Sequence, residues 1–173
     1  MPIKEDLKKQ ILLSELSVGE ISKLAEKVTT ENYPKGKAIF KEGEPTKGIY
    51  LIKKGKVEIS KLTPDGWKQT LAVLKDGHFF GELSIIEDKK VHGADAIALE
   101  NTELFFIKKE DFKELEQTEP LIMYKIMKTI AKVASRNVHS MNERLIKLTN
   151  KLLMAGLTCL INFQLKGEVT YAP

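Results

Sequence analysis

The sequence predicts an α+β fold: an antiparallel double-stranded β-helix, or jelly-roll barrel, flanked by N-terminal helices and a long C-terminal helix. Apolar residues recur at three- and four-residue intervals before residue 28, in short β-branched and aromatic runs between about 30 and 107, and in heptads after 118. This change from helical to strand periodicity and back places helices at both ends of one sheet region. The expected organisation is a barrel domain at 1–117, a long helix at 118–156 and a tail at 157–173.

Residues 3–28 are expected to be helical, in two pieces. Gly19 suggests the break between them. Ser17, followed three residues later by Glu20, has the capping-box pattern that begins a helix. The apolar positions of this region have helical spacing: Leu7, Ile11, Leu12, Leu16, Ile21, Leu24, Ala25 and Val28.

The middle of the chain reads as about eight short strands. Strand-like runs and glycine- or proline-containing turns alternate at about ten-residue spacing, which favours an antiparallel barrel over a parallel sheet. The runs are Ala38-Ile39-Phe40, Ile49-Tyr50-Leu51-Ile52, Lys56-Val57-Glu58-Ile59, Thr70-Leu71-Ala72-Val73-Leu74, Asp95-Ala96-Ile97-Ala98 and Thr102-Glu103-Leu104-Phe105-Phe106-Ile107.

A short helix is expected at 110–117, and Pro120 suits the first turn of the long helix that follows. Heptad spacing then lasts for more than three repeats, which favours a helix that pairs with a copy of itself; packing against its own barrel is the alternative. The expected dimer seam is Met127, Ala131, Ala134, Val138, Met141, Leu145 and Leu148, continued by Leu152. Ala155-Gly156 is expected to end the seam, and the tail reads as a strand fragment or a frayed end.

Composition excludes several classes of protein. The 173 residues allow one domain with a core plus an appendage. A net charge of +4, from 28 basic and 24 acidic residues, fits solvated faces and does not indicate nucleic-acid binding. The single cysteine, Cys159, excludes an internal disulfide and fits a cytoplasmic protein. The most apolar stretch, 152–163, is shorter than the roughly 20 residues of a membrane-spanning helix.

Two segments carry the candidate site. The first is Phe80-Gly81-Glu82-Leu83-Ser84, and the second, ten positions after Glu82, is His92-Gly93-Ala94-Asp95-Ala96. In the first segment, glycine lets backbone approach a ligand, and free N–H groups at a helix start attract an anion. Taken alone, the same residues also fit an ordinary turn whose acid complements the helix dipole.

From residue 16 to about 148, the chain resembles the cyclic-nucleotide-binding domain family of catabolite-activator-type regulators and kinase regulatory subunits. The resemblance rests on Pro34-Lys35-Gly36, Gly43-Glu44-Pro45, Tyr50-Leu51-Ile52, Gly55-Lys56-Val57, Phe80-Gly81-Glu82-Leu83 and Phe112. It implies that Gly81 approaches a cyclic phosphate and that Glu82 binds the ribose 2′-hydroxyl. Leu83 lies in the same segment, and Ser84, Gly93 and Ala94 would supply further close contacts.

The sequence departs from the family where an arginine would grip the phosphate, because that position is His92. Arginine matches two phosphate oxygens with a permanently charged fork, whereas histidine is mostly neutral at pH 7 and gains charge only towards pH 6. The loss is expected to cost about 1.5–3 kcal/mol, or one to two decades in affinity. Lys89 and Lys90 either substitute as point charges or belong to a solvated loop, and Asp95 would oppose a phosphate if it pointed inward.

No other constellation predicts chemistry. His78 and His139 have no partner at metal-ligand spacing, and no serine–histidine–acid arrangement supports a nucleophile, so neither a metal site nor an enzyme is expected. Ser135, Asn137 and Ser140 would face a purine bound by the partner subunit if the family's regulator branch is the guide; ordinary helix-surface polarity is the alternative.

Two hypotheses follow. In the first, the protein is a stand-alone sensory domain that binds a small anion, such as cyclic AMP or cyclic GMP weakly, and signals through its C-terminal helices as a homodimer. In the second, it is a degenerate member that acts as a dimeric scaffold for an unidentified protein partner. Neither needs a cofactor. A DNA-reading unit would need roughly 50–70 residues after the long helix, and the sequence holds 23 from Lys151 onward, so direct DNA binding is not expected.

Overall fold

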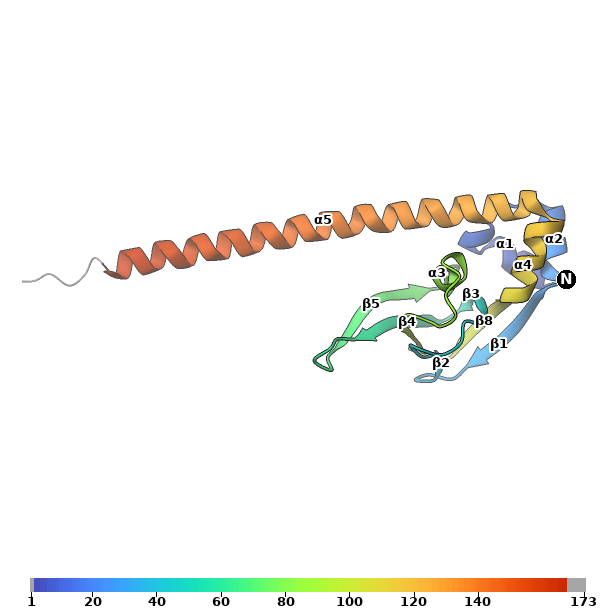
Figure 1. Ribbon diagram of the computed structural model, residues 1–173, viewed down its shortest axis with the longest axis horizontal. Coiled ribbons are helices and arrows are strands. Elements are labelled where there is room, and N and C mark those ends of the chain that lie inside the picture. The colour runs from blue at the N-terminus through green and yellow to red at the C-terminus, as the bar shows by residue number, and fades with distance from the viewer. Residues whose placement is uncertain (1, 168–173) are drawn as a thin grey trace, which may run out of the picture. The chain divides into compact units, whose positions relative to one another are not determined.

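The computed structural model describes the backbone of residues 2–167 and the side chains of residues 3–155 (Figure 1). The chain divides into two compact units, Met1–Ile130 and Ala131–Pro173. The elements are α1 (Pro2–Lys8), the 3-10 helix η1 (Ile11–Leu13), α2 (Val18–Ala25), β1 (Val28–Tyr33), β2 (Ala38–Phe40), β3 (Gly48–Lys54), β4 (Lys56–Leu62), β5 (Lys68–Lys75), β6 (Phe79–Phe80), α3 (Glu82–Ile86), β7 (Asp95–Ala98), β8 (Thr102–Lys108), α4 (Lys109–Thr118) and α5 (Pro120–Gly167).

The barrel is built from two four-stranded antiparallel sheets, in the orders β1-β8-β3-β6 and β2-β7-β4-β5. Each strand of the first half of the barrel therefore pairs with one distant in sequence, as β1 does with β8 from Val28–Ile107 to Tyr33–Thr102. Together with the flanking helices, this confirms the predicted α+β fold class with an antiparallel barrel.

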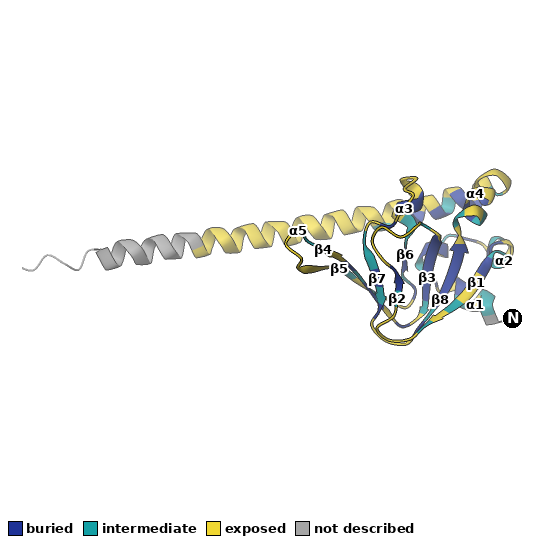
Figure 2. Ribbon diagram, turned by 60° about the horizontal axis from the view of Figure 1, so that its bottom comes forward, coloured by how far each residue is buried: buried dark blue, intermediate teal, exposed yellow. Residues whose placement is uncertain are grey.

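The core lies on both faces of β3 and β8, which Figure 2 shows as the most buried strands. On β3, Tyr50 and Ile52 belong to an aromatic cluster inside the barrel. Ile49 and Leu51 alternate with them and are also fully buried, so the opposite face of the strand is covered too. The barrel interior is completed by Ile39, Phe40, Val57, Phe80, Ala96, Leu104 and Phe106.

The N-terminal region is helical, but its divisions differ from the prediction. The capping box of Ser17 and Glu20 is confirmed. Because that box begins α2, Gly19 lies inside the helix rather than at a break, and the interruptions fall earlier, on either side of η1. Val28 begins strand β1 rather than ending a helix, since its backbone pairs with Ile107 of β8.

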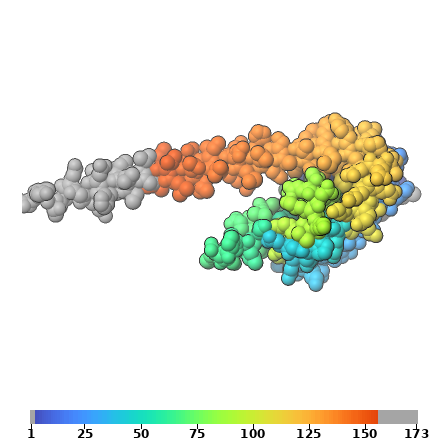
Figure 3. All heavy atoms as spheres, in the orientation of Figure 1, coloured from blue at the N-terminus to red at the C-terminus, as the bar shows by residue number. Residues whose placement is uncertain are grey.

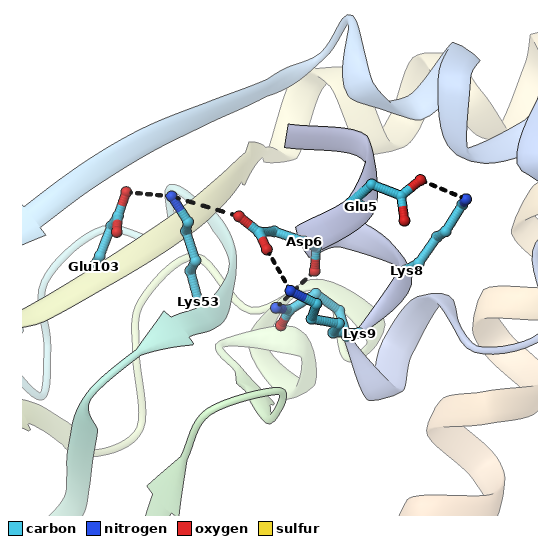
Figure 4. Close-up of polar contacts among 7 residues, drawn as sticks. Glu5, Asp6, Lys8, Lys9, Lys53 and Glu103 are labelled. Carbon is cyan, nitrogen blue, oxygen red and sulfur yellow. Dashed lines mark hydrogen bonds and ion pairs between the residues drawn. The ribbon is translucent and has the colours of Figure 1, made fainter. Parts of the chain in front are cut away.

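Helix α1 is attached to the barrel by an ionic cluster (Figure 4). Lys53 of β3 lies between Glu103 of β8, at 2.7 Å, and Asp6 of α1, at 3.7 Å. Asp6 is also paired with Lys9, at 2.8 Å. These groups line a surface hollow of about 420 Å³. Partly exposed ion pairs contribute little each, so the cluster orients α1 more than it stabilises it.

Helix α5 starts at Pro120 as expected, and its first turns are held by α2 and its preceding loop. Lys125 bonds the Glu20 carboxylate at 2.7 and 2.8 Å, and Lys128 lies 3.2 Å from Glu15. The helix continues to Gly167, past the end predicted at Ala155-Gly156, and the last tail residues, 168–173, lie outside the described residues. Within the part of the chain that is described, no helix is both long and apolar enough to cross a bilayer.

The β4–β5 hairpin carries apolar side chains at its surface. Its turn is closed by the Trp67 carbonyl, which accepts the Thr63 amide at 2.8 Å. Trp67, the chain's single tryptophan, is 77% exposed, and Leu62, Leu71 and Val73 are also more than half exposed.

The Glu20–Lys125 pair predicts a pH dependence of stability. Lys125, followed by the Ser17 amide, lowers the pKa of Glu20 from 4.5 to about 2. A depressed carboxyl pKa gives stability that is present above pH 4.5 and is lost as the pH falls towards 2. We therefore expect Glu20→Gln to lower the urea midpoint at pH 7 and to flatten its fall between pH 4.5 and 2. Glu26→Gln, an exposed position at the opposite end of the same helix, is the control; an equal effect there would contradict the assignment.

Candidate functional site

The first site segment joins β6 to α3, and Gly81 at the junction requires glycine. Its φ is +87°, and a Cβ there would lie 2.9 Å from the Gly48 carbonyl oxygen and 3.3 Å from the Tyr50 ring. Any other residue would be strained and would push against β3. The region around α3 lies at the surface of the first unit (green in Figure 3).

Glu82 is a half-buried carboxylate at the start of α3. Burial raises its pKa, an effect partly offset by a hydrogen bond with its own backbone. Among the described residues, no ion pair is formed with it. Its oxygens are thus available to accept hydrogen bonds. Leu83 next to it is exposed, and Ser84 is buried.

The second site segment places His92 inside the protein rather than at the surface. The residue is 2% exposed, and its ring stacks on Phe40 with centroids 3.6 Å apart and planes 5° apart. Its amide donates to the Glu44 carbonyl at 2.8 Å, and its carbonyl accepts the Gly43 amide at 2.9 Å. Both backbone groups are therefore fixed by the 43–44 turn.

Burial disfavours the charged form of the His92 imidazole. Burial lowers the pKa of His92, although the nearby Glu44 carboxylate opposes this. Its Nε2 is buried and has no hydrogen-bond partner among the described residues. In this arrangement the Nε2 of His92 offers no accessible donor to an anion, and the lowered pKa disfavours a charged ring.

The rest of the second segment is fixed by the neighbouring turn and strand. The Asp95 carboxylate accepts the Glu42 amide at 2.7 Å, so it is engaged in a turn. The Gly93 carbonyl accepts from the Lys61 ammonium at 3.3 Å, and a Cβ at Gly93 would meet nothing within 4 Å. Ala94 is half-buried. Lys89, a candidate cation, is paired with Glu87 instead.

Phe40 links the two segments. Its ring lies 5.8 Å from that of Phe80, which precedes Gly81, and 3.6 Å from that of His92. From the sequence Phe40 was predicted as a strand residue and not as a site residue, and Lys61 was not predicted to have a role. Their signals were an aromatic residue that ends a short strand and a lysine in step with Val57 and Ile59 on β4.

A family match covers this whole region. The profile described as "Cyclic nucleotide-binding domain" matches residues 30–119, which is more than half of the chain. The chain belongs to the cyclic nucleotide-binding domain family. The resemblance read from the sequence motifs is thereby confirmed, and both site segments fall inside the matched residues.

Two curated members of the family are similar to this chain in sequence. The "Cyclic AMP receptor protein" of Thermus thermophilus is 35% identical over 100 residues, which is 58% of this chain and 46% of that protein. A "cAMP-dependent protein kinase regulatory subunit" of Debaryomyces hansenii is 44% identical over 85 residues, 49% of this chain and 18% of that protein. The chain thus spans less than half the length of either curated relative.

Solved structures of the family superpose on the chain. The Thermus thermophilus Catabolite Activator Protein aligns with a TM-score of 0.68 at 30% identity, covering 81% of this chain and 63% of that one. The regulatory subunit of a cAMP-independent protein kinase A from Trypanosoma brucei aligns with a TM-score of 0.69 at 19% identity, covering 83% and 50%. At that identity the second match shows the shared fold alone.

The predicted dimer seam of this family member divides between the two units. Met127 lies in the first, on the part of α5 next to α2. Ala131, Ala134, Val138, Met141, Leu145 and Leu148 lie in the second, which is a continuous helix through its described residues, and these side chains are exposed in the single chain. Ser135, Asn137 and Ser140 are partly or fully exposed on the same helix.

Proposed function

We propose that the protein is a cytoplasmic regulatory domain, not an enzyme, that binds a small anionic ligand and signals through α5 as a homodimer. Cyclic AMP and cyclic GMP are the candidate ligands, bound weakly between Gly81–Ser84 and His92–Ala94. No cofactor is required and no DNA or membrane contact is part of the proposal. The observation that carries it is the unpaired, half-buried Glu82 carboxylate beside Gly81.

Glu82 supports a ligand because burying an unpaired carboxylate opposes folding. Its raised pKa reflects that cost. Ribose hydroxyls that donate to the carboxylate would offset the cost and would return the pKa towards its ordinary value. The family's named relatives include a cyclic AMP receptor protein and cAMP-dependent kinase regulatory subunits, which fits this class of ligand.

Weak affinity is proposed because of His92. A neutral, buried imidazole cannot replace the arginine fork that the family resemblance implies. An imidazole with an ordinary pKa would gain charge towards pH 6. Because burial lowers the pKa of His92, that charge would appear only at a lower pH.

Homodimerisation through α5 is proposed from the heptad seam. Four of its apolar side chains, Val138, Met141, Leu145 and Leu148, are more than half exposed in the single chain. An apolar row that repeats every seven residues matches a second copy of the same helix.

A second candidate function, a dimeric scaffold without nucleotide, is favoured by one observation. The stacked rings of His92 and Phe40 extend the aromatic cluster inside the barrel, towards the segment where a phosphate would bind. Such a protein would keep the fold and the seam and would act through a protein partner.

Replacing Glu82 tests the ligand proposal. In calorimetric titrations with cyclic AMP and cyclic GMP, we expect the unmodified protein to bind with a micromolar or weaker Kd. Glu82→Gln should weaken binding about tenfold, since it removes the charged acceptor for a ribose hydroxyl. Glu87→Gln, five residues along and exposed, is the matched control. Absence of binding by the unmodified protein, with the dimer intact, would favour the scaffold.

A further inference from the structure

Lys61 lies on the side of β4 that faces the barrel interior. Along this strand Val57 is fully buried in the interior cluster and Ile59 packs against it, so Lys61 continues the same alternate row. On the opposite face, Glu58 accepts hydrogen bonds from Lys68 and from Thr70 of β5. Lys61 and Lys68 of this hairpin therefore lie on different faces.

The Lys61 ammonium contacts the second site segment directly. Its Nζ lies 3.3 Å from the Gly93 carbonyl oxygen and 2.8 Å from Oε1 of Glu42. Glu42 is in turn fixed by its own amide, which donates to Asp95 at 2.7 Å. One ammonium and one carboxylate are thus held beside the residues His92–Ala94, and both side chains are about half exposed.

Two of the other candidate cations are shielded or engaged. Burial lowers the pKa of His92 and encloses its Nε2, and Lys89 is paired with Glu87 in the turn after α3. An anion that reached residues 92–94 would therefore meet Lys61 as the ammonium already in hydrogen-bond contact with that backbone.

We infer that Lys61 supplies the positive charge for the phosphate of the ligand, in place of the absent arginine, and that the Glu42 carboxylate is the internal competitor which the phosphate displaces. This inference rests on the proposed function and names the residue that supplies the positive charge of the binding site. A lysine binds phosphate as a point charge and not as a fork, which agrees with weak affinity. Displacement of Glu42 lowers the affinity further, because the ligand must first break the ion pair between Lys61 and Glu42.

The test is a double-mutant cycle on the full chain, read by calorimetric titration with cyclic AMP. Lys61→Met should raise Kd tenfold or more, and Glu42→Gln should lower it about threefold to tenfold because the competitor is gone. In the Lys61→Met background, Glu42→Gln should have no effect. Lys89→Met is the control: it removes the same charge close to the first site segment and should leave Kd unchanged.

The outcomes separate the two proposals. If the unmodified protein binds and Lys61→Met binds equally well, the inference is overturned while the proposed function stands. A gain from Glu42→Gln that persists without Lys61 would also overturn it, because the effect would then come from net charge. No binding by any variant, Glu42→Gln included, would overturn both. Unchanged thermal melting of the free variants is expected, since half-exposed ion pairs add little stability.

Discussion

Replacing Val138 and Met141 with glutamate is expected to convert a dimeric protein into monomers. The two positions are adjacent in the heptad seam and 55% and 68% exposed in the single chain. In the monomer the substitutions therefore cost little. In a pair of helices, Val138→Glu and Met141→Glu would bury four uncompensated charges, at several kcal/mol each. Light scattering at micromolar concentration should show the halved mass.

The control for this experiment uses the neighbouring outer positions. His139→Glu and Ser140→Glu introduce the same charge at sites outside the heptad row and should leave the dimer intact. If the unmodified protein is already monomeric at micromolar concentration, the heptad interpretation is wrong.

Replacing His92 with arginine is expected to have opposite effects on the free and the ligand-bound protein. Without ligand, a guanidinium in this buried position is only partly compensated by the nearby Glu44 carboxylate, so the free energy of unfolding should fall by on the order of 2 kcal/mol. With cyclic AMP, the fork pairs with the phosphate, and affinity should rise ten- to a hundredfold. Calorimetry gives the affinity, and thermal melting with and without ligand gives the stability.

The matched control is His139→Arg, which adds the same charge on the second unit and should change neither quantity. A His92→Arg protein that is folded and yet binds no cyclic nucleotide would favour the scaffold function. Tight binding by the unmodified protein at pH 8, unaffected by His92→Arg, would show that another residue holds the phosphate.

The change from helical to strand periodicity was enough to predict the fold class. A helix or strand that buries one face must repeat its apolar residues with the period of that element, and this pattern depends on neighbouring residues alone. The residues at which elements begin and end were harder to predict from the sequence. Val28 has a residue type and spacing that suit a helix, but its pairing with Ile107, 79 residues away, decides for a strand. Gly156 does not end α5: a glycine in a helix interior costs only about 1 kcal/mol, and its strongly helix-forming neighbours carry the helix on to Gly167.

The site was predictable where backbone geometry demands one residue type. Gly81 is such a position, because only glycine fits against Gly48 and Tyr50. The stacking of His92 on Phe40 and the contact of Lys61 with Gly93 were not predictable. Both depend on the registers of β2 and β4 against β7, which are set by long-range pairing and by a shift between Ala38 and Phe40.

The exposed Trp67 makes the β4–β5 hairpin spectroscopically separate from the core. As the single tryptophan lies in water in the folded chain, its emission should already be red-shifted and should change little when the protein is denatured. Tyrosine fluorescence reports on the core instead, because the Tyr50 side chain is buried there. Tryptophan fluorescence is therefore a poor probe of unfolding for this protein. It is a selective probe for molecules that bind to the hairpin, on which Lys61 lies six residues before Trp67.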